Sequence, residues 1–118
     1  MQRDWCYKIV DGTQGQVASK TNCESVGGRL ALISSQDEMN AARSYMQGYS
    51  GRAFIDGTDA AQEGVWLDAE GNAMPYSGWT VSEPNGGSGE NCKGIAASEV
   101  FDVGCIGSQY ATLGLCEQ

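Results

Sequence analysis

Five cysteines in a chain of 118 residues constrain the fold of this protein more than any other feature of its sequence. They are Cys6, Cys23, Cys92, Cys105 and Cys116. The chain has neither histidine nor a C-x-x-C pair, so it lacks the usual ligands and spacing of a zinc site. Cysteines at this density are typical of proteins from oxidising compartments, and the sequence therefore predicts a secreted, extracellular protein. Spacing alone leaves the disulfide pairing open.

Composition predicts a single domain over residues 1–118, because this length matches one domain and 41% apolar residues can form one core. No apolar run approaches the roughly 20 residues of a membrane span. No hydrophobic stretch follows Met1, so no signal peptide is expected in this sequence, which would fit a mature form. A net charge of −8 argues against nucleic acid as a partner, since nucleic-acid binding needs clustered Lys and Arg.

The first third of the chain predicts a strand, a helix and a second strand. Residues 5–10 are rich in aromatic and β-branched side chains, which favours a strand. A helix is expected over 14–26, with Gly27-Gly28 as its stop. A short buried strand is expected at 30–33. The inner face of the helix is predicted to be Val17, Ala18, Thr21 and Cys23.

A second helix is predicted after Ser35, which forms a capping box with Glu38. Met39, Ala42 and Met46 recur at helical spacing, so this helix is expected to run to about residue 47. Strands are expected at 53–56, 64–68, 92–97, 99–103 and 111–117, where short apolar runs alternate with Gly and Asp. Two helices followed by β-rich sequence indicate an α+β domain.

The stretch from about 69 to 91 has little helix or strand character, and long loops in compact domains are usually functional. It contains Glu83-Pro84-Asn85 and Glu90, and Asp102 lies three residues before Cys105. Carboxylate and amide oxygens on a loop suit Ca²⁺, which takes about 6–8 oxygen ligands. The sequence therefore predicts a cation-binding loop, although an ordinary proline-containing turn explains the same residues.

In the order of its motifs, the chain resembles the C-type lectin-like domain along essentially its whole length. The matching landmarks are Trp5-Cys6-Tyr7, Cys23, Gly28-Arg29-Leu30-Ala31, Ser34-Ser35, Phe54-Ile55-Asp56-Gly57, Glu63-Gly64-Val65-Trp66, Trp79, Glu83-Pro84-Asn85 and Asp102-Val103-Gly104-Cys105. The resemblance implies an α+β fold of two helices with small antiparallel sheets and a long calcium-binding loop region. It also implies two disulfides, Cys23–Cys116 and Cys92–Cys105.

These pairings leave Cys6 without a partner inside the chain. In longer family members a cysteine at this place pairs with one upstream. Three fates are therefore open to Cys6: a link between two subunits of a homodimer, a buried thiol, or a bond to an upstream cysteine that is absent here.

The resemblance implies a principal Ca²⁺ site made by Glu83, Asn85, Glu90 and Asp102, with a cis peptide before Pro84. Two neighbouring sugar hydroxyls would coordinate the ion, while each donates to a carboxylate and accepts from an amide. In the family, the order Glu-Pro-Asn goes with mannose-type ligands such as mannose, glucose, N-acetylglucosamine or fucose. A calcium-dependent carbohydrate-binding lectin is therefore expected. It is not expected to be an enzyme, because few candidates for a catalytic nucleophile remain.

Phe101 is a departure from the family pattern, since it replaces the Asn of the Asn-Asp pair that contributes to the site. Phenylalanine can neither ligate Ca²⁺ nor donate to the second hydroxyl, so sugar selectivity stays open. Its ring can stack on a sugar face or pack within the protein. The substitution also supports an alternative function, a lectin-like domain that binds no sugar and recognises a protein or an ice surface.

A second, auxiliary Ca²⁺ site is implied at Asp59, Glu63 and Asn91, with Glu90 shared between the two sites. Asp59-x-x-x-Glu63 matches the family's auxiliary pair, whereas Asn91 stands where aspartate is common. Exposed carboxylates beside a turn are an equally good interpretation of these residues. One calcium ion is therefore expected, and a second is open.

Overall fold

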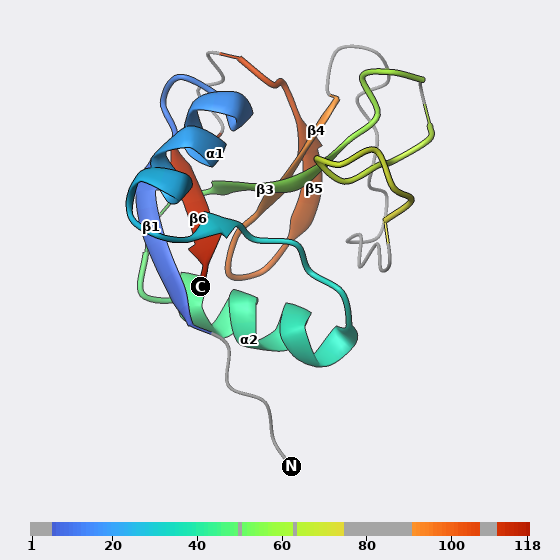
Figure 1. Ribbon diagram of the computed structural model, residues 1–118. Coiled ribbons are helices and arrows are strands. Elements are labelled where there is room, and N and C mark those ends of the chain that lie inside the picture. The colour runs from blue at the N-terminus through green and yellow to red at the C-terminus, as the bar shows by residue number, and fades with distance from the viewer. Residues whose placement is uncertain (1–5, 50, 63, 75–90, 107–110) are drawn as a thin grey trace.

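The structure is a computed structural model that describes residues 6–49, 51–62, 64–74, 91–106 and 111–118. Its elements are β1 (Tyr7–Asp11), α1 (Gln16–Ser25), β2 (Arg29–Leu30), α2 (Gln36–Met46), β3 (Ala53–Thr58), β4 (Cys92–Ile95), β5 (Val100–Val103) and β6 (Leu113–Glu117). The α+β class is therefore confirmed. In Figure 1, α1 lies beside β1 and β6, whereas α2 lies at the opposite end of the sheet.

The described strands form one six-stranded sheet, where the sequence predicted small antiparallel sheets. The strand order is β1-β6-β3-β4-β5, with β2 also paired to β6. The single sheet arises because β6 pairs antiparallel with β1 and parallel with β3. The last strand of the chain thus lies between the first strand and the β3–β4–β5 meander.

The bounds of α1 agree with the prediction to within two residues, and its predicted inner face is confirmed at Cys23 but wrong at Val17 and Thr21, which are exposed. Ser19 and Cys23 are the buried residues of α1, whereas Val17 is 76% exposed. Two contacts set this face. Cys23 is bonded to β6, and a Cβ added at Gly114 of β6 would lie 2.8 Å from the Ser19 Cβ. Small side chains therefore let the helix approach the strand closely, and Val17 and Thr21 lie outside the contact.

α2 follows its sequence signals closely. The Ser35 Oγ accepts a hydrogen bond from the Glu38 backbone N–H at 3.1 Å, which confirms the predicted N-cap. The Glu38 carboxylate, however, accepts from the backbone of Ser34 instead of Ser35. The predicted apolar face is confirmed, because Met39, Ala42 and Met46 are buried in the main core cluster.

Two predicted strands differ in the structure. The strand expected at 30–33 is confined to Arg29–Leu30, although Ala31 continues the interaction by donating to the Leu115 carbonyl. The strand expected at 64–68 is wrong, since only Leu67 forms isolated bridges, to Thr58 and Ala73. This segment follows β3 and lies near β4 and β5, away from α2 (Figure 1).

Both disulfides implied by the resemblance are confirmed. Cys23–Cys116 joins α1 to β6 across 93 positions, and Cys92–Cys105 joins the start of β4 to the segment after β5 across 13 positions. The first closes almost the whole chain into a loop. The second disulfide fixes the end of the β4–β5 pair at which Asp102 lies.

Candidate functional site

Of the four residues predicted to bind the principal calcium ion, the structure describes Asp102. Glu83, Asn85 and Glu90 lie outside the described residues, as do Pro84 and Trp79. Asp102 lies on β5 and is 5% exposed. It sits one position from the Cys92–Val103 pair of the β4–β5 ladder, next to the disulfide at Cys92. This carboxylate is therefore held on a rigid element.

Lys93 faces the same side of the sheet as Asp102, because the two residues are direct cross-strand partners. Lys93 is 1% exposed, and its methylenes lie 3.2 Å from the position of a Cβ added at Gly57. Lys93 was not singled out from the sequence. The feature that could have revealed it is that Lys93 is the one charged residue in the strand predicted at 92–97. The structure thus adds a buried ammonium to the strand beside the predicted ligand Asp102.

Burial lowers the pKa of Lys93 to about 8, below the ordinary value of 10.5. The unfolded chain therefore binds more protons than the folded chain between these two values. We expect the free energy of unfolding to rise with pH across this window. Above about pH 10 it should fall, because burial raises the pKa of Tyr7 and raises that of Tyr45 to about 12.

Urea denaturation between pH 7 and pH 11 measures this alkaline maximum. A Cys6→Ser background prevents thiol–disulfide exchange at high pH. In that background, Lys93→Met should remove the rise between pH 8 and pH 10 and leave the later decline. A rise of unchanged size in the Lys93→Met variant would show that another group titrates.

Phe101 is buried, with 6% of its surface exposed. Its ring covers Gly94 of β4, where an added Cβ would lie 2.6 Å and 2.8 Å from two ring carbons. The Arg52 guanidinium lies 5.8 Å from the ring centroid. Because protein atoms cover the ring, this geometry favours packing over stacking on a sugar.

The predicted auxiliary site is described at Asp59 and Asn91, whereas Glu63 lies outside the described residues. The Asp59 backbone N–H donates to the Asn91 carbonyl at 3.0 Å, so the two residues are neighbours. Asp59 is 2% exposed, which contradicts the alternative of an exposed carboxylate at this position.

The two carboxylate oxygens of Asp59 differ in their surroundings. Oδ2 accepts from the Gly64 N–H at 2.9 Å. Oδ1 is buried and has no hydrogen-bond partner in the described part of the chain. A buried carboxylate oxygen without a donor is costly, and a cation would satisfy it. The unpartnered carboxylate oxygen of Asp59 therefore fits a hard cation such as Ca²⁺, which prefers oxygen ligands.

Within the described ranges, no group of three or more His, Cys, Asp or Glu side chains is arranged to hold a metal ion. Five of the seven predicted ligands are outside those ranges or are asparagine: Glu63, Glu83, Asn85, Glu90 and Asn91.

Cys6 is the free cysteine of the described residues, and it is exposed. The buried-thiol alternative is therefore wrong. Cys6 lies immediately before β1, where its backbone carbonyl accepts a hydrogen bond from the Gln118 N–H at 3.0 Å. A link between subunits and a bond to an upstream cysteine both stay predictions.

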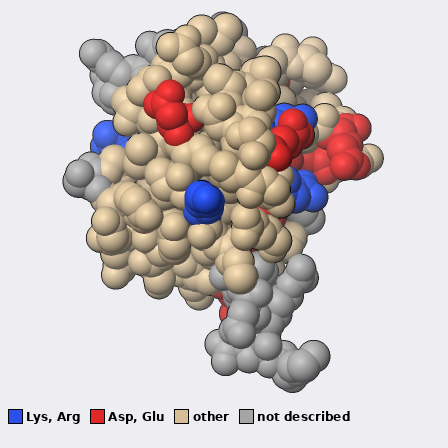
Figure 2. Space-filling view, turned by 60° about the vertical axis from the view of Figure 1, so that its left-hand side comes forward, with Lys and Arg blue, Asp and Glu red and all other residues tan. Residues whose placement is uncertain are grey.

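Surface charge on the face shown in Figure 2 is sparse, with wide uncharged areas between the charged side chains. Acidic and basic side chains mix at one edge, and the described residues of this face present no cluster of Lys and Arg. Among the helices that the structure describes, none has the length and apolar character needed to cross a membrane.

Comparison with known proteins gives matches across most of the chain. A family model described as the lectin C-type domain matches residues 13–118. A tetranectin-like protein of Carcharhinus perezii is 36% identical over 79% of this chain and 57% of its own length. C-type lectin domain family 3 member A of Bos taurus is 33% identical over 74% of this chain and 46% of its own length. The chain thus spans about half the length of these relatives.

Solved structures agree with these matches. The mouse scavenger receptor C-type lectin carbohydrate-recognition domain has a TM-score of 0.82 and 26% identity, covering 100% of this chain and 91% of that one. The carbohydrate-recognition domain of cow CD23 has a TM-score of 0.80 and 25% identity, and the match covers 99% of this chain and 89% of that one. A calcium-independent type II antifreeze protein shares the fold, with a TM-score of 0.75 and 22% identity over 100% and 88%. With its two helices, sheet and two internal disulfides, the chain belongs to the C-type lectin domain family.

Proposed function

We propose that this chain is a secreted, calcium-dependent carbohydrate-binding lectin with mannose-type preference. The observation that supports it most is the buried carboxylate of Asp102 on β5, in a C-type lectin domain whose sequence also carries Glu83-Pro84-Asn85 and Glu90. Two disulfides in so small a chain support an oxidising, extracellular setting.

All four residues proposed for the principal site, Glu83, Asn85, Glu90 and Asp102, would supply oxygen atoms to the cation. Glu83 would also accept a hydrogen bond from one sugar hydroxyl, and the Asn85 amide N–H would donate to it, which fixes the orientation of that hydroxyl. A bound calcium ion supplies open coordination positions for two neighbouring hydroxyls. This order of acceptor and donor favours equatorial 3- and 4-hydroxyls, as in mannose.

Phe101 removes one amide from this arrangement. The second hydroxyl would then lack a donor from β5, so discrimination among mannose, glucose, N-acetylglucosamine and fucose should be weak. A monosaccharide also makes few contacts, and affinity for a single site should be low. A homodimer linked through the exposed Cys6 would raise avidity for a glycan that carries several sugars.

An auxiliary calcium ion is proposed at Asp59, Glu63 and Asn91. The unpartnered Oδ1 of Asp59 supports it, because a cation there would satisfy a buried oxygen. Asp59 is connected through Asn91 to the start of β4, so this ion would tie the segment after β3 to that strand. Its role would be to stiffen the binding loop.

The relatives support sugar binding without deciding its type. Nattectin of Thalassophryne nattereri, which is named a galactose-specific lectin, is 30% identical over 68% of this chain. The cow CD23 domain was solved in the presence of a GlcNAc₂Man₃ oligosaccharide. The Glu-Pro-Asn order of this chain favours the mannose type.

Calorimetric titration tests the proposal. Methyl α-mannoside and methyl β-galactoside are titrated into the protein in millimolar calcium and again in EDTA. We expect binding of the mannoside in the millimolar range, about −4 kcal/mol, and only with calcium. A Glu83→Gln/Asn85→Asp variant, which reverses donor and acceptor, should shift preference toward galactoside. Equal or absent heats under all conditions would reject sugar binding and favour recognition of a protein or ice surface.

A further inference from the structure

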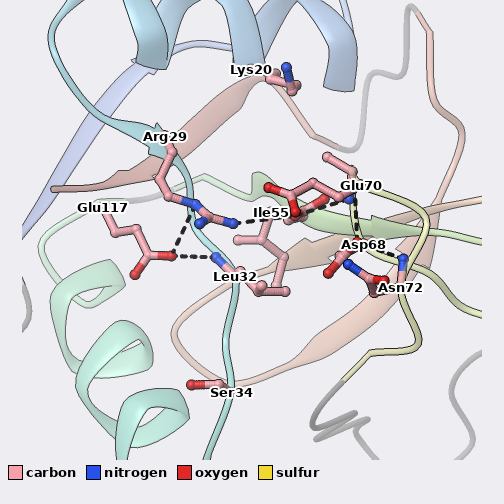
Figure 3. Close-up of polar contacts among 12 residues, drawn as sticks. Lys20, Arg29, Leu32, Ser34, Ile55, Asp68, Glu70, Asn72 and Glu117 are labelled. Atoms are coloured by element: carbon pink, nitrogen blue, oxygen red, sulfur yellow. Dashed lines mark hydrogen bonds and ion pairs between the residues drawn. The ribbon is translucent and has the colours of Figure 1, made fainter.

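A recess of about 340 Å³ lies between α2 and β6, away from the residues predicted to bind calcium. Its lining includes two acidic side chains from distant parts of the chain, Glu38 of α2 and Glu117 of β6. Figure 3 shows Glu117 beside Arg29 and Leu32, with Ser34 farther along the same segment. The proposed carbohydrate site gives neither acid a role.

Glu38 is 2% exposed, and its two carboxylate oxygens have different surroundings. Oε1 accepts from the Ser34 backbone N–H at 3.0 Å and from the Ser34 hydroxyl at 2.9 Å. Oε2 is buried and has no hydrogen-bond donor in the described part of the chain. An ionised carboxylate would leave this oxygen unsatisfied at a substantial cost.

Glu117 approaches Glu38 from the sheet. Its Oε1 accepts from the Leu32 N–H at 2.7 Å, and the Arg29 Nε is 3.8 Å away, too far for a direct hydrogen bond. The Glu117 and Glu38 side chains line the same recess, so their carboxyl groups are neighbours there. Two ionised carboxylates cannot bond to each other, but one proton between them supplies the donor that Oε2 of Glu38 lacks.

The groups that face this pair come from two further elements. Tyr7 of β1 donates from its hydroxyl to the Glu38 carbonyl at 3.4 Å, and Arg29 of β2 reaches the Glu117 carboxylate. Burial raises the pKa of Glu117 most, and the charge and hydrogen bond of Glu38 raise it further. The Leu32 N–H and Arg29 lower it, but the net direction is upward.

We propose that Glu38 and Glu117 hold one proton between them and thereby form an acid-closed latch that joins the first turn of α2 to β6. When the proton leaves, two negative charges face each other in the recess. The start of α2 then loses its connection to the C-terminal strand, whereas Leu32 keeps its hydrogen bond to Glu117. The latch is independent of calcium and of carbohydrate.

The expected pH dependence follows from the sign of the pKa shift. A carboxyl whose folded pKa is raised binds more protons in the folded chain than in the unfolded chain between the two values. The latch therefore contributes its full stability below the ordinary value of about 4.5, and loses it as pH rises through the folded pKa. Asp56, whose pKa burial also raises, adds a slope of the same sign.

Glu38→Gln isolates the latch from Asp56. The amide N–H can donate permanently to Glu117, while the amide oxygen still accepts from Ser34. In EDTA, the thermal midpoint of the wild type should fall between pH 4.5 and pH 7, and this fall should be smaller in the variant by about 4 °C or more. Glu70→Gln, which removes an exposed carboxyl near Arg29, should keep the wild-type slope.

Amide hydrogen exchange locates the change. At pH 7 the amides of residues 34–38 should exchange several-fold faster in the wild type than in Glu38→Gln, with those of β3 unchanged. If Glu38→Gln does not fold, Glu117→Gln provides the same comparison. Identical pH slopes in wild type and variant would overturn the latch. So would a calcium-induced rise of the midpoint that either variant abolishes, because a cation would then join the two carboxylates.

Discussion

Removal of the Cys23–Cys116 disulfide by a Cys23→Ala/Cys116→Ala double variant is expected to lower the free energy of unfolding by roughly 4–5 kcal/mol. The bond closes a loop of 93 positions, and the entropy of the unfolded chain rises sharply when so long a loop is opened. Both cysteines are fully buried, and their bond holds α1 against β6. Total stabilities of domains are about 5–15 kcal/mol, so the variant should be marginally folded.

The shorter disulfide supplies the matched control. Cys92→Ala/Cys105→Ala opens a loop of only 13 positions and should cost about 3 kcal/mol. Both pairs are compared by denaturation in guanidinium chloride, in a Cys6→Ser background that excludes new disulfides. A larger loss from the shorter bond would contradict the loop-closure account and place the main constraint at the β4–β5 pair.

Replacement of Asp102 by alanine is expected to weaken calcium binding at the principal site by about a hundredfold or more, close to 3 kcal/mol. The variant removes the buried carboxylate that is proposed as a charged oxygen ligand, and Phe101 offers no replacement. Asp102→Asn keeps one side-chain oxygen, so its calcium affinity should lie between those of the wild type and Asp102→Ala. Calcium titration by calorimetry measures the three affinities.

Two controls separate loss of a ligand from loss of the fold. Glu99 lies in the same β4–β5 hairpin, and its carboxylate pairs with Arg52 at 3.3 Å. Glu99→Gln removes this carboxylate and should leave calcium affinity unchanged. The thermal midpoint in EDTA reports how far each Asp102 variant loses stability without metal. Equal calcium affinity in Asp102→Ala and wild type would remove Asp102 from the site.

Local signals in the sequence predicted the second helix well. Ser35 caps α2, and Met39, Ala42 and Met46 point into the core as their spacing indicates. These features depend on residues within one or two turns of each other. The disulfides were predicted by family resemblance, because the cysteine spacing alone does not select a pairing.

Long-range contacts explain what the sequence did not predict. The buried face of α1 is chosen by Cys116 and Gly114 of β6, nearly a hundred residues away, so Val17 lies on the outside despite its apolar character. The single sheet likewise depends on where β6 inserts. At the site, Lys93 was missed because its neighbour Asp102 is adjacent across strands and distant in the sequence.

A crystal structure of the protein grown in millimolar calcium chloride with methyl α-mannoside tests the central claim most directly. The account predicts a calcium ion bound by Glu83, Asn85, Glu90 and Asp102, with two neighbouring hydroxyls of the sugar completing its coordination. Only water among these four side chains would contradict it, even with the fold, both disulfides and the strand order unchanged.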